Sequence, residues 1–178
     1  MTISKTFYRI LFAFSLLFGV FNALAFGLEL SQIQSTMTQN IQKTLEILQK
    51  NTTKNPKDSA ISSTQVENIA KEIFIMFDSI FDYNLMAQLS LSKDYKTLTK
   101  IQQEEYTQAF EQNLKRSFTD KLRLYKDEKL EVLGGEQPKN NRYNLKTSMV
   151  LDGKLNYVIF KFYEKEGDWK IYDVDILG

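Results

Sequence analysis

The chain of 178 residues contains no cysteine and no histidine. Without cysteine, no disulfide can stabilise the fold, so its stability must come from an apolar core. The two absences together remove Ser-His-Asp and Cys-His nucleophile systems and the usual ligands of zinc and copper. Only carboxylates, lysine, tyrosine, serine and threonine remain for chemistry, and we expect neither enzymatic activity nor a cofactor.

The sequence also lacks an excess of positive charge and any phosphate-binding loop. It carries 23 Lys and Arg against 22 Asp and Glu, and such a balance argues against a protein that neutralises nucleic-acid phosphates. The glycine pair Gly134-Gly135 has no Walker or dinucleotide pattern around it, so it indicates a bulge or turn. The lysines Lys93, Lys96 and Lys100 are expected to face solvent. Nucleic acid is therefore not an expected partner.

The long apolar run is confined to the first 25 residues, where it has the form of a signal peptide. Lys5 and Arg9 precede an apolar stretch from Ile10 to Phe21, and Ala23-Leu24-Ala25 matches a signal-peptidase site. The run is short for a membrane span, and Phe26 is not a lipid-accepting cysteine. We predict cleavage after residue 25, export, and a single domain over 26–178; the alternative is an uncleaved anchor.

Apolar residues at steps of three and four predict three amphipathic helices. The first covers about 28–49, the second follows a capping box at Thr64-Gln65-Val66-Glu67, and the third follows one at Thr99-Lys100-Ile101-Gln102. A shorter helix is expected to start at Asp82. The stripes are Leu30, Ile33, Met37, Ile41, Leu45 and Leu48; Val66, Ile69, Ile73 and Phe77; and Tyr106, Phe110, Leu114, Phe118, Leu122 and Tyr125.

Beyond Lys126 the period changes to two, which predicts strands near 129–136, 141–151, 154–164 and 168–177. Asp152-Gly153 fits a two-residue hairpin turn, and Lys165-Glu166-Gly167-Asp168 a looser one. Such short connections force antiparallel neighbours. The fold class is therefore α+β, with N-terminal helices packed on a C-terminal four-stranded antiparallel sheet and an apolar cavity between them.

Several carboxylates lie close together in the sequence. Asp173 and Asp175 would share one face of a strand, and such a pair can divide acid and base roles in glycoside hydrolysis. The spacing alone is weak support for catalysis, and solvated or capping carboxylates are the favoured interpretation. We expect Asp173 to accept hydrogen bonds from nearby backbone or hydroxyl groups, with no hydrolytic role.

Three motifs follow one another along the chain: Ile80-Phe81-Asp82-Tyr83-Asn84-Leu85-Met86-Ala87, then Leu98-Thr99 ahead of the long helix, and finally Trp169-Lys170-Ile171-Tyr172-Asp173-Val174-Asp175-Ile176-Leu177-Gly178. In this order they resemble the MlaC, or toluene-tolerance, family of periplasmic phospholipid carriers. The last motif is similar to the family's terminal strand. The family tends to have tyrosine at the position of Phe160, and its chains usually continue past the position of Gly178.

The resemblance implies a periplasmic carrier that holds acyl chains in an apolar cavity and shuttles phospholipid, as a monomer, between an inner-membrane ABC-transporter complex and an outer-membrane lipoprotein/porin complex. Two alternatives remain open: a binding or adaptor module without lipid, and a carboxylate-dependent hydrolase. The lipid-binding residues predicted on the helical stripes and strand faces are Phe77, Phe81, Leu85, Met86, Leu89, Tyr106, Phe110, Leu114, Phe118, Val158, Phe160, Phe162, Tyr172 and Val174.

Overall fold

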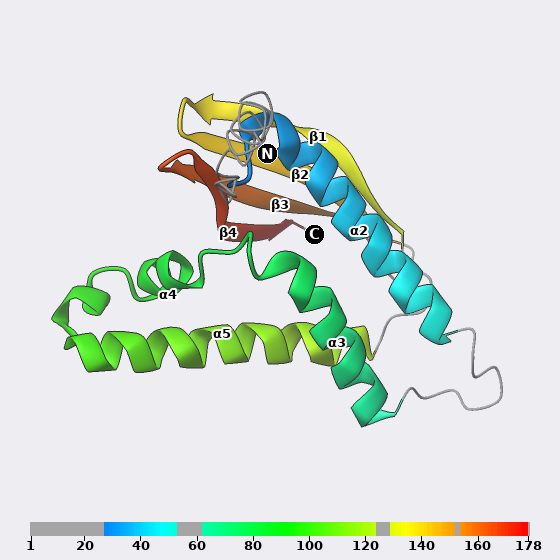
Figure 1. Cartoon of the computed structure of the whole chain (residues 1–178), viewed down its shortest axis with the longest axis horizontal. Coiled ribbons are helices and arrows are strands. Elements are labelled where there is room, and N and C mark those ends of the chain that lie inside the picture. The colour runs from blue at the N-terminus through cyan, green and yellow to red at the C-terminus, as the bar shows by residue number, and fades with distance from the viewer. Residues whose placement is uncertain (1–26, 53–61, 124–128, 152–153, 178) are drawn as a thin grey trace, which may run out of the picture.

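The computed structural model describes residues 27–52, 62–123, 129–151 and 154–177. In these ranges four α-helices precede a four-stranded antiparallel sheet, which confirms the α+β prediction. Figure 1 shows the sheet as one layer and α3, α4 and α5 as a second layer beneath it. The signal-peptide prediction falls on residues outside the described ranges.

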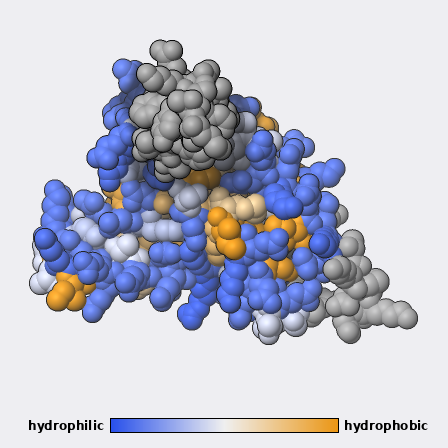
Figure 2. All heavy atoms as spheres, in the orientation of Figure 1, coloured by the Kyte–Doolittle hydropathy of each residue, from blue (hydrophilic) through white to orange (hydrophobic). Residues whose placement is uncertain are grey.

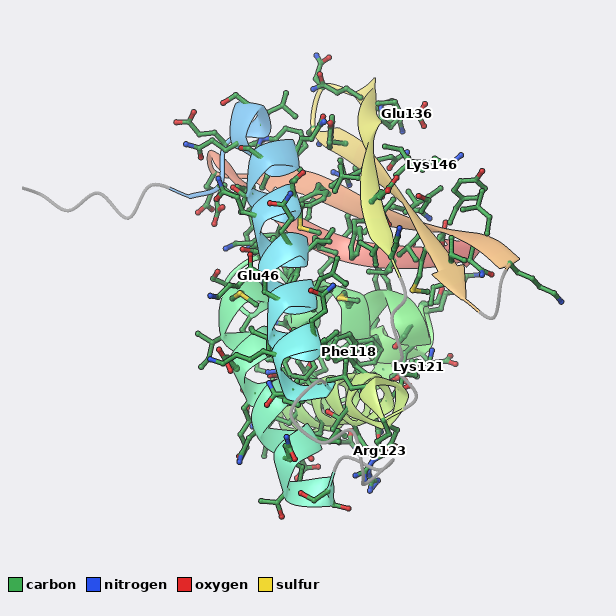
Figure 3. The ribbon with its side chains drawn as sticks, turned by 90° about the vertical axis from the view of Figure 1, so that its right-hand side faces the viewer. Glu46, Phe118, Lys121, Arg123, Glu136 and Lys146 are labelled. Atoms are coloured by element: carbon green, nitrogen blue, oxygen red, sulfur yellow. The ribbon has the colours of Figure 1, made fainter. Side chains whose placement is uncertain are left out.

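Helix α2 (Leu30–Thr52) connects the two layers. Ile33 and Met37 on its first half are fully buried against the sheet, and Ile47 and Leu48 on its second half pack with the other helices. Figure 3 shows α2 passing over the sheet and then over the helical layer. The predicted apolar stripe therefore packs against the sheet with its first half and against the other helices with its second half.

Helix α3 (Ser63–Phe77) begins two residues earlier than the sequence predicted. The N-cap is Ser62, whose hydroxyl accepts a hydrogen bond from the Gln65 backbone N–H at 3.3 Å. The capping box predicted at Thr64 is wrong, because Thr64 already lies inside the helix. Ser62, Ser63 and Thr64 are all cap-competent side chains, and the structure has the N-cap at Ser62.

Helix α4 (Tyr83–Leu91) and helix α5 (Lys100–Leu122) begin where the sequence predicted, with a short 3₁₀ helix, η1 (Asp94–Thr97), between them. The Asp82 carboxylate accepts from the Leu85 N–H at 2.8 Å. The Thr99 hydroxyl accepts from the Gln102 N–H, while the Gln102 side chain accepts from the Thr99 N–H at 2.9 Å. Both N-termini are thus closed by side chains, as predicted.

The sheet is a meander in the order β1 (Leu130–Lys139), β2 (Arg142–Leu151), β3 (Lys154–Lys165) and β4 (Asp168–Leu177). A register shift at Gly134, which has φ of 119°, confirms the predicted bulge. The looser turn at 165–168 is also confirmed. The turn predicted at Asp152-Gly153 lies outside the described residues.

The residues just before α4 attach the helical layer to the outer edge of β4. The Asp82 N–H donates to the Ile171 carbonyl at 2.9 Å, and the Ile171 N–H donates to the Ile80 carbonyl at 2.8 Å. Phe81 thereby forms a parallel bridge with Ile171. This attachment fixes where α4 starts relative to the sheet.

The core consists of two apolar clusters. The sheet cluster contains the buried residues Ile33, Met37, Ile80, Leu145, Phe162, Trp169 and Ile171. The helix cluster contains Ile47, Leu48, Val66, Ile69, Ala70, Ile73 and Leu122. Phe77 packs against both clusters from the C-terminal end of α3. Among the described elements, α5 packs mainly on α3 and α4, while α2 and α4 pack on the sheet.

Candidate functional site

A cavity of about 860 Å³ opens between the start of α4, the N-terminal half of α5 and the β3–β4 turn. Its size is in the range of sites for organic ligands. Its lining is Phe81, Asp82, Tyr83 and Asn84; Tyr95; Lys100, Gln103, Glu104, Thr107, Gln108 and Glu111; and Tyr163, Lys165, Glu166, Asp168 and Lys170. Aromatic rings and charged groups share this wall, so it differs from the purely apolar cavity that the sequence predicted.

The Asp82 carboxylate in the cavity wall accepts two hydrogen bonds. One carboxylate oxygen caps α4 through the Leu85 N–H at 2.8 Å, and the other accepts a short hydrogen bond from the Tyr163 hydroxyl. Burial, and then this hydrogen bond, raise the pKa of the Tyr163 phenol well above its usual range. The half-buried Asp82 carboxylate is therefore held in place by one bond from α4 and one from β3.

Tyr83 begins a polar cluster beside the cavity. Its hydroxyl donates to Asp78 at 2.7 Å, and the Lys115 ammonium forms ion pairs with Asp78 at 2.9 Å and with Glu111 at 2.7 Å. Burial and the hydrogen bond to Asp78 raise the pKa of Tyr83. The Lys115 ammonium also lies 5.0 Å from the Tyr83 ring centre. These contacts join the C-terminus of α3 and the start of α4 to the middle of α5.

Asp168 joins the β3–β4 turn to the segment that leads into α2. One of its oxygens accepts from the Leu28 N–H at 2.7 Å, and the other pairs with Lys170 at 2.7 Å. A Cβ on Gly27 would lie 2.4 Å from the Asp168 Cβ, so the absence of a side chain permits this close approach. The cavity wall at the turn is thus supported from the start of α2.

Five polar side chains at the cavity make no hydrogen bond or ion pair within the described structure. They are Lys100, Glu104 and Gln108 on α5, and Lys165 and Glu166 at the β3–β4 turn, and all are exposed. The expectation that Lys93, Lys96 and Lys100 face solvent is also met, since all three are exposed.

Of the fourteen predicted lipid-binding residues, Phe81 alone belongs to the cavity wall. Phe162 is a member of the sheet cluster, and Phe160 and Val174 pack against this cluster. Phe118 packs against the helix cluster, with its ring centre 5.3 Å from that of Phe74. Figure 3, which looks along α5, places Phe118 between α5 and α2.

The remaining predicted residues differ in burial. Met86 and Val158 are buried, and Leu89 is half exposed. Leu85, Tyr106, Phe110 and Leu114 are half-buried, although the last three form the centre of the predicted α5 stripe. Helix α5 therefore presents an apolar stripe that the protein itself covers only in part.

Tyr172 lies on the opposite face of the sheet from Val174. Its ring meets Tyr163 edge to face at 5.8 Å, and the Arg142 guanidinium lies over both rings. Regular alternation would have placed Tyr172 beside Val174, but the β3–β4 register shifts by one residue between Lys161 and Phe162. This bulge reverses the predicted orientation.

Asp173 and Asp175 share one sheet face, as predicted, and both bind Lys161 on the neighbouring strand. The Lys161 ammonium lies 2.9 Å from Asp173 and 2.6 Å from Asp175. Hydrogen bonds to Asp175 and Asp173 raise the pKa of Lys161. Asp173 also accepts from the Val174 N–H, so its partners are a lysine as well as backbone. The pair therefore stabilises a contact between β3 and β4 through Lys161.

A family model described as MlaC protein matches residues 38–178. The chain belongs to the MlaC family. This confirms the resemblance found in the Phe81-Asp82 motif and the terminal strand. In the structure, Phe81 and Asp82 form the cavity wall, while Trp169 and Ile171 of the terminal strand are buried in the sheet cluster.

Among solved structures, the MlaC-type chain is similar to the phospholipid-binding protein from Ralstonia solanacearum, determined in complex with a phospholipid. The TM-score is 0.62 at 13% sequence identity, and the match covers 80% of this chain and 76% of the other. At this identity the comparison establishes a shared fold. No curated protein sequence matches the chain.

Two further observations concern what the described residues do not contain. None of their helices is long and apolar enough to cross a membrane. No group of acidic side chains in these ranges is arranged to hold a metal ion.

Figure 2 shows apolar side chains gathered in the middle of one face, between the sheet and the mostly hydrophilic surface of α5.

Proposed function

We propose that this MlaC-family protein is a phospholipid carrier that works in the periplasm after export. Family membership supports a lipid ligand, and the structurally similar Ralstonia protein was determined with a phospholipid bound. The N-terminal signal-peptide pattern supports export. The partners expected from the family are an inner-membrane ABC-transporter complex and an outer-membrane lipoprotein/porin complex.

The observation that carries the proposal is the position of Phe81, which belongs both to the cavity wall and to the edge of the sheet cluster. A phospholipid needs a polar site for its headgroup beside an apolar site for its acyl chains. We place the headgroup in the cavity and the acyl chains beyond Phe81, against the partly covered α5 stripe at Phe110 and Leu114.

The acyl chains of a carried phospholipid must be shielded from water. Each methylene exposed to water costs about 0.8 kcal/mol, so two chains of about fifteen carbons would cost on the order of 20 kcal/mol without an apolar environment. Apolar surface is available on the half-buried side chains of α5. It is also available on Phe160 of β3 and Val174 of β4, which are partly buried against the sheet cluster. A carrier needs no catalytic carboxylates, which agrees with the structural ion pairs that Asp173 and Asp175 form with Lys161.

The experiment is to purify residues 26–178 from a bacterial host without detergent and to analyse an organic extract by mass spectrometry. We expect glycerophospholipid to co-purify. Protein that is lipid-free, and that takes up no lipid from phospholipid vesicles, would favour the adaptor alternative. Sequencing the N-terminus of the exported protein tests localisation, with Phe26 as the expected first residue.

A further inference from the structure

We propose that the cavity favours phospholipids whose headgroup carries an amine cation beside the phosphate, of the ethanolamine class, over headgroups with negative charge alone. This inference rests on the proposed function. The cavity wall holds five carboxylates, Asp82, Glu104, Glu111, Glu166 and Asp168, and three ammonium groups, Lys100, Lys165 and Lys170. Negative groups therefore outnumber positive ones around the ligand.

Most of the inner charges are already compensated within the protein. Lys170 is paired with Asp168 and also donates to the Ser79 carbonyl at 2.6 Å. Glu111 is paired with Lys115. The Asp168–Lys170 pair leaves no full charge for a ligand, whereas Lys115 is shared between Glu111 and Asp78, so this cluster keeps one net negative charge beside the cavity.

Asp82 is different, because no cation of the described structure forms an ion pair with it. Its two hydrogen bonds come from the Leu85 N–H and the Tyr163 hydroxyl, which are neutral groups. The N-terminus of α4 favours a negative charge at this position. The rings of Phe81, Tyr83 and Tyr163 line the same wall. A carboxylate among aromatic faces attracts an ammonium group and repels a phosphate.

The cavity rim offers one cation and one carboxylate on each side. Helix α5 contributes Lys100 and Glu104, and the β3–β4 turn contributes Lys165 and Glu166, all exposed and without partners in the described structure. A zwitterionic headgroup can place its phosphate near a lysine and its amine near a carboxylate. A headgroup with only negative charge finds the same lysines but is repelled by Asp82, Glu104 and Glu166.

The size of the preference follows from the exposure of these groups. Exposed ion pairs contribute little each because water and salt screen them. We therefore expect the ethanolamine lipid to be enriched about five-fold to ten-fold over the glycerol lipid. The enrichment should fall as the salt concentration rises.

The test loads delipidated protein from vesicles of equimolar phosphatidylethanolamine and phosphatidylglycerol with identical acyl chains, followed by mass spectrometry of the bound lipid. Asp82→Asn keeps an N-cap that is as good as aspartate and removes the charge, and its amide NH2 takes the place of the oxygen that accepts from Tyr163. Glu104→Gln/Glu166→Gln removes the rim charges without touching Asp82. Each should lower the enrichment toward unity.

The matched control is Glu67→Gln/Glu72→Gln, which removes two exposed carboxylates of α3 outside the cavity wall and should leave the enrichment unchanged. Equal loading of both lipids by the unmodified protein, preference for phosphatidylglycerol, or an enrichment that survives in both cavity variants would overturn this inference while the carrier function stands. Absence of both lipids would instead overturn the carrier function. The rim variant keeps the test decisive even if Asp82→Asn does not fold.

Discussion

At the scale of single residues, two tyrosine hydroxyls connect separate elements through carboxylates. Tyr83 donates to Asp78, and Tyr163 donates to Asp82 across the edge of the sheet. In both cases burial is the larger cause of the raised pKa and the hydrogen bond to the carboxylate is the next. Both phenols are therefore bound more tightly to their protons in the folded state than in the unfolded state.

This difference predicts loss of stability at alkaline pH. A raised pKa contributes stability that is fully present below the unfolded-state pKa of about 10 and is lost as the pH rises toward the folded-state pKa. Each tyrosine should lower the free energy of unfolding by at most about 1.4 kcal/mol per pH unit in this range. Lys115 and Lys161, whose pKa values are also raised, act in the same direction.

The measurement is urea unfolding between pH 8 and about 11.5, monitored by circular dichroism. Tyr83→Phe/Tyr163→Phe should be less stable than the unmodified protein at pH 8 but should lose less stability as the pH rises. Tyr157→Phe is the control, because Tyr157 donates to no carboxylate in the described structure. An identical alkaline slope for the double variant and the unmodified protein would show that these hydrogen bonds do not set the pH dependence.

At the scale of elements, the N-termini of α3 and α5 test what a capping pattern can predict. The Thr99 capping box of α5 was predicted correctly, since Thr99 and Gln102 form both hydrogen bonds of the box. At α3 the residues Ser62, Ser63 and Thr64 all qualify locally, and the predicted choice was wrong. Which hydroxyl meets a free N–H depends on where the tertiary contacts of the helix begin, and this information is not in the local pattern.

The corrected N-cap predicts unequal effects of two similar substitutions. Ser62→Ala removes the acceptor of the Gln65 N–H and should lower the free energy of unfolding by about 1 kcal/mol. Thr64→Ala removes an exposed side chain within the first turn of α3 and should be neutral or slightly stabilising, because alanine has the higher helix propensity. Thermal unfolding of the two variants under one condition provides the comparison. A larger loss for Thr64→Ala would place the cap where the sequence pattern did.

At the scale of the whole molecule, periodicity predicted the helices, the strands and the meander, but it did not predict how they divide the core. The stripe of α2 is continuous in sequence, yet its two halves enter different clusters. The cavity wall combines segments far apart in the chain, from Phe81 to Lys170, and no local pattern connects them. The Phe81-Asp82 motif was the one sequence signal for this wall. The face of the sheet on which Tyr172 lies was predicted wrongly, because a bulge interrupts the alternation that the prediction assumed.

The division of the core predicts opposite outcomes for the same substitution at two positions of α5. Phe118 packs against the helix cluster and the Phe74 ring, so Phe118→Glu should lower the free energy of unfolding by about 2–4 kcal/mol, because it removes this packing and brings a carboxylate against the cluster. Phe110 is half-buried and lies outside the residues that form or border either cluster. Phe110→Glu should therefore fold, with a modest fall in melting temperature, and should lose phospholipid, because the carboxylate would lie where we place the acyl chains.

The matched control is Ile101→Glu, which makes an equivalent change at a position on α5 that is 69% exposed. It should change neither the melting temperature nor the bound lipid by much. Circular dichroism melting and mass spectrometry of extracted lipid measure both quantities on each variant. If Phe110→Glu folds and retains as much phospholipid as Ile101→Glu, the α5 stripe does not line the acyl-chain site. The partly covered stripe would then be an ordinary amphipathic surface, and the acyl chains would have to lie elsewhere along the sheet cluster.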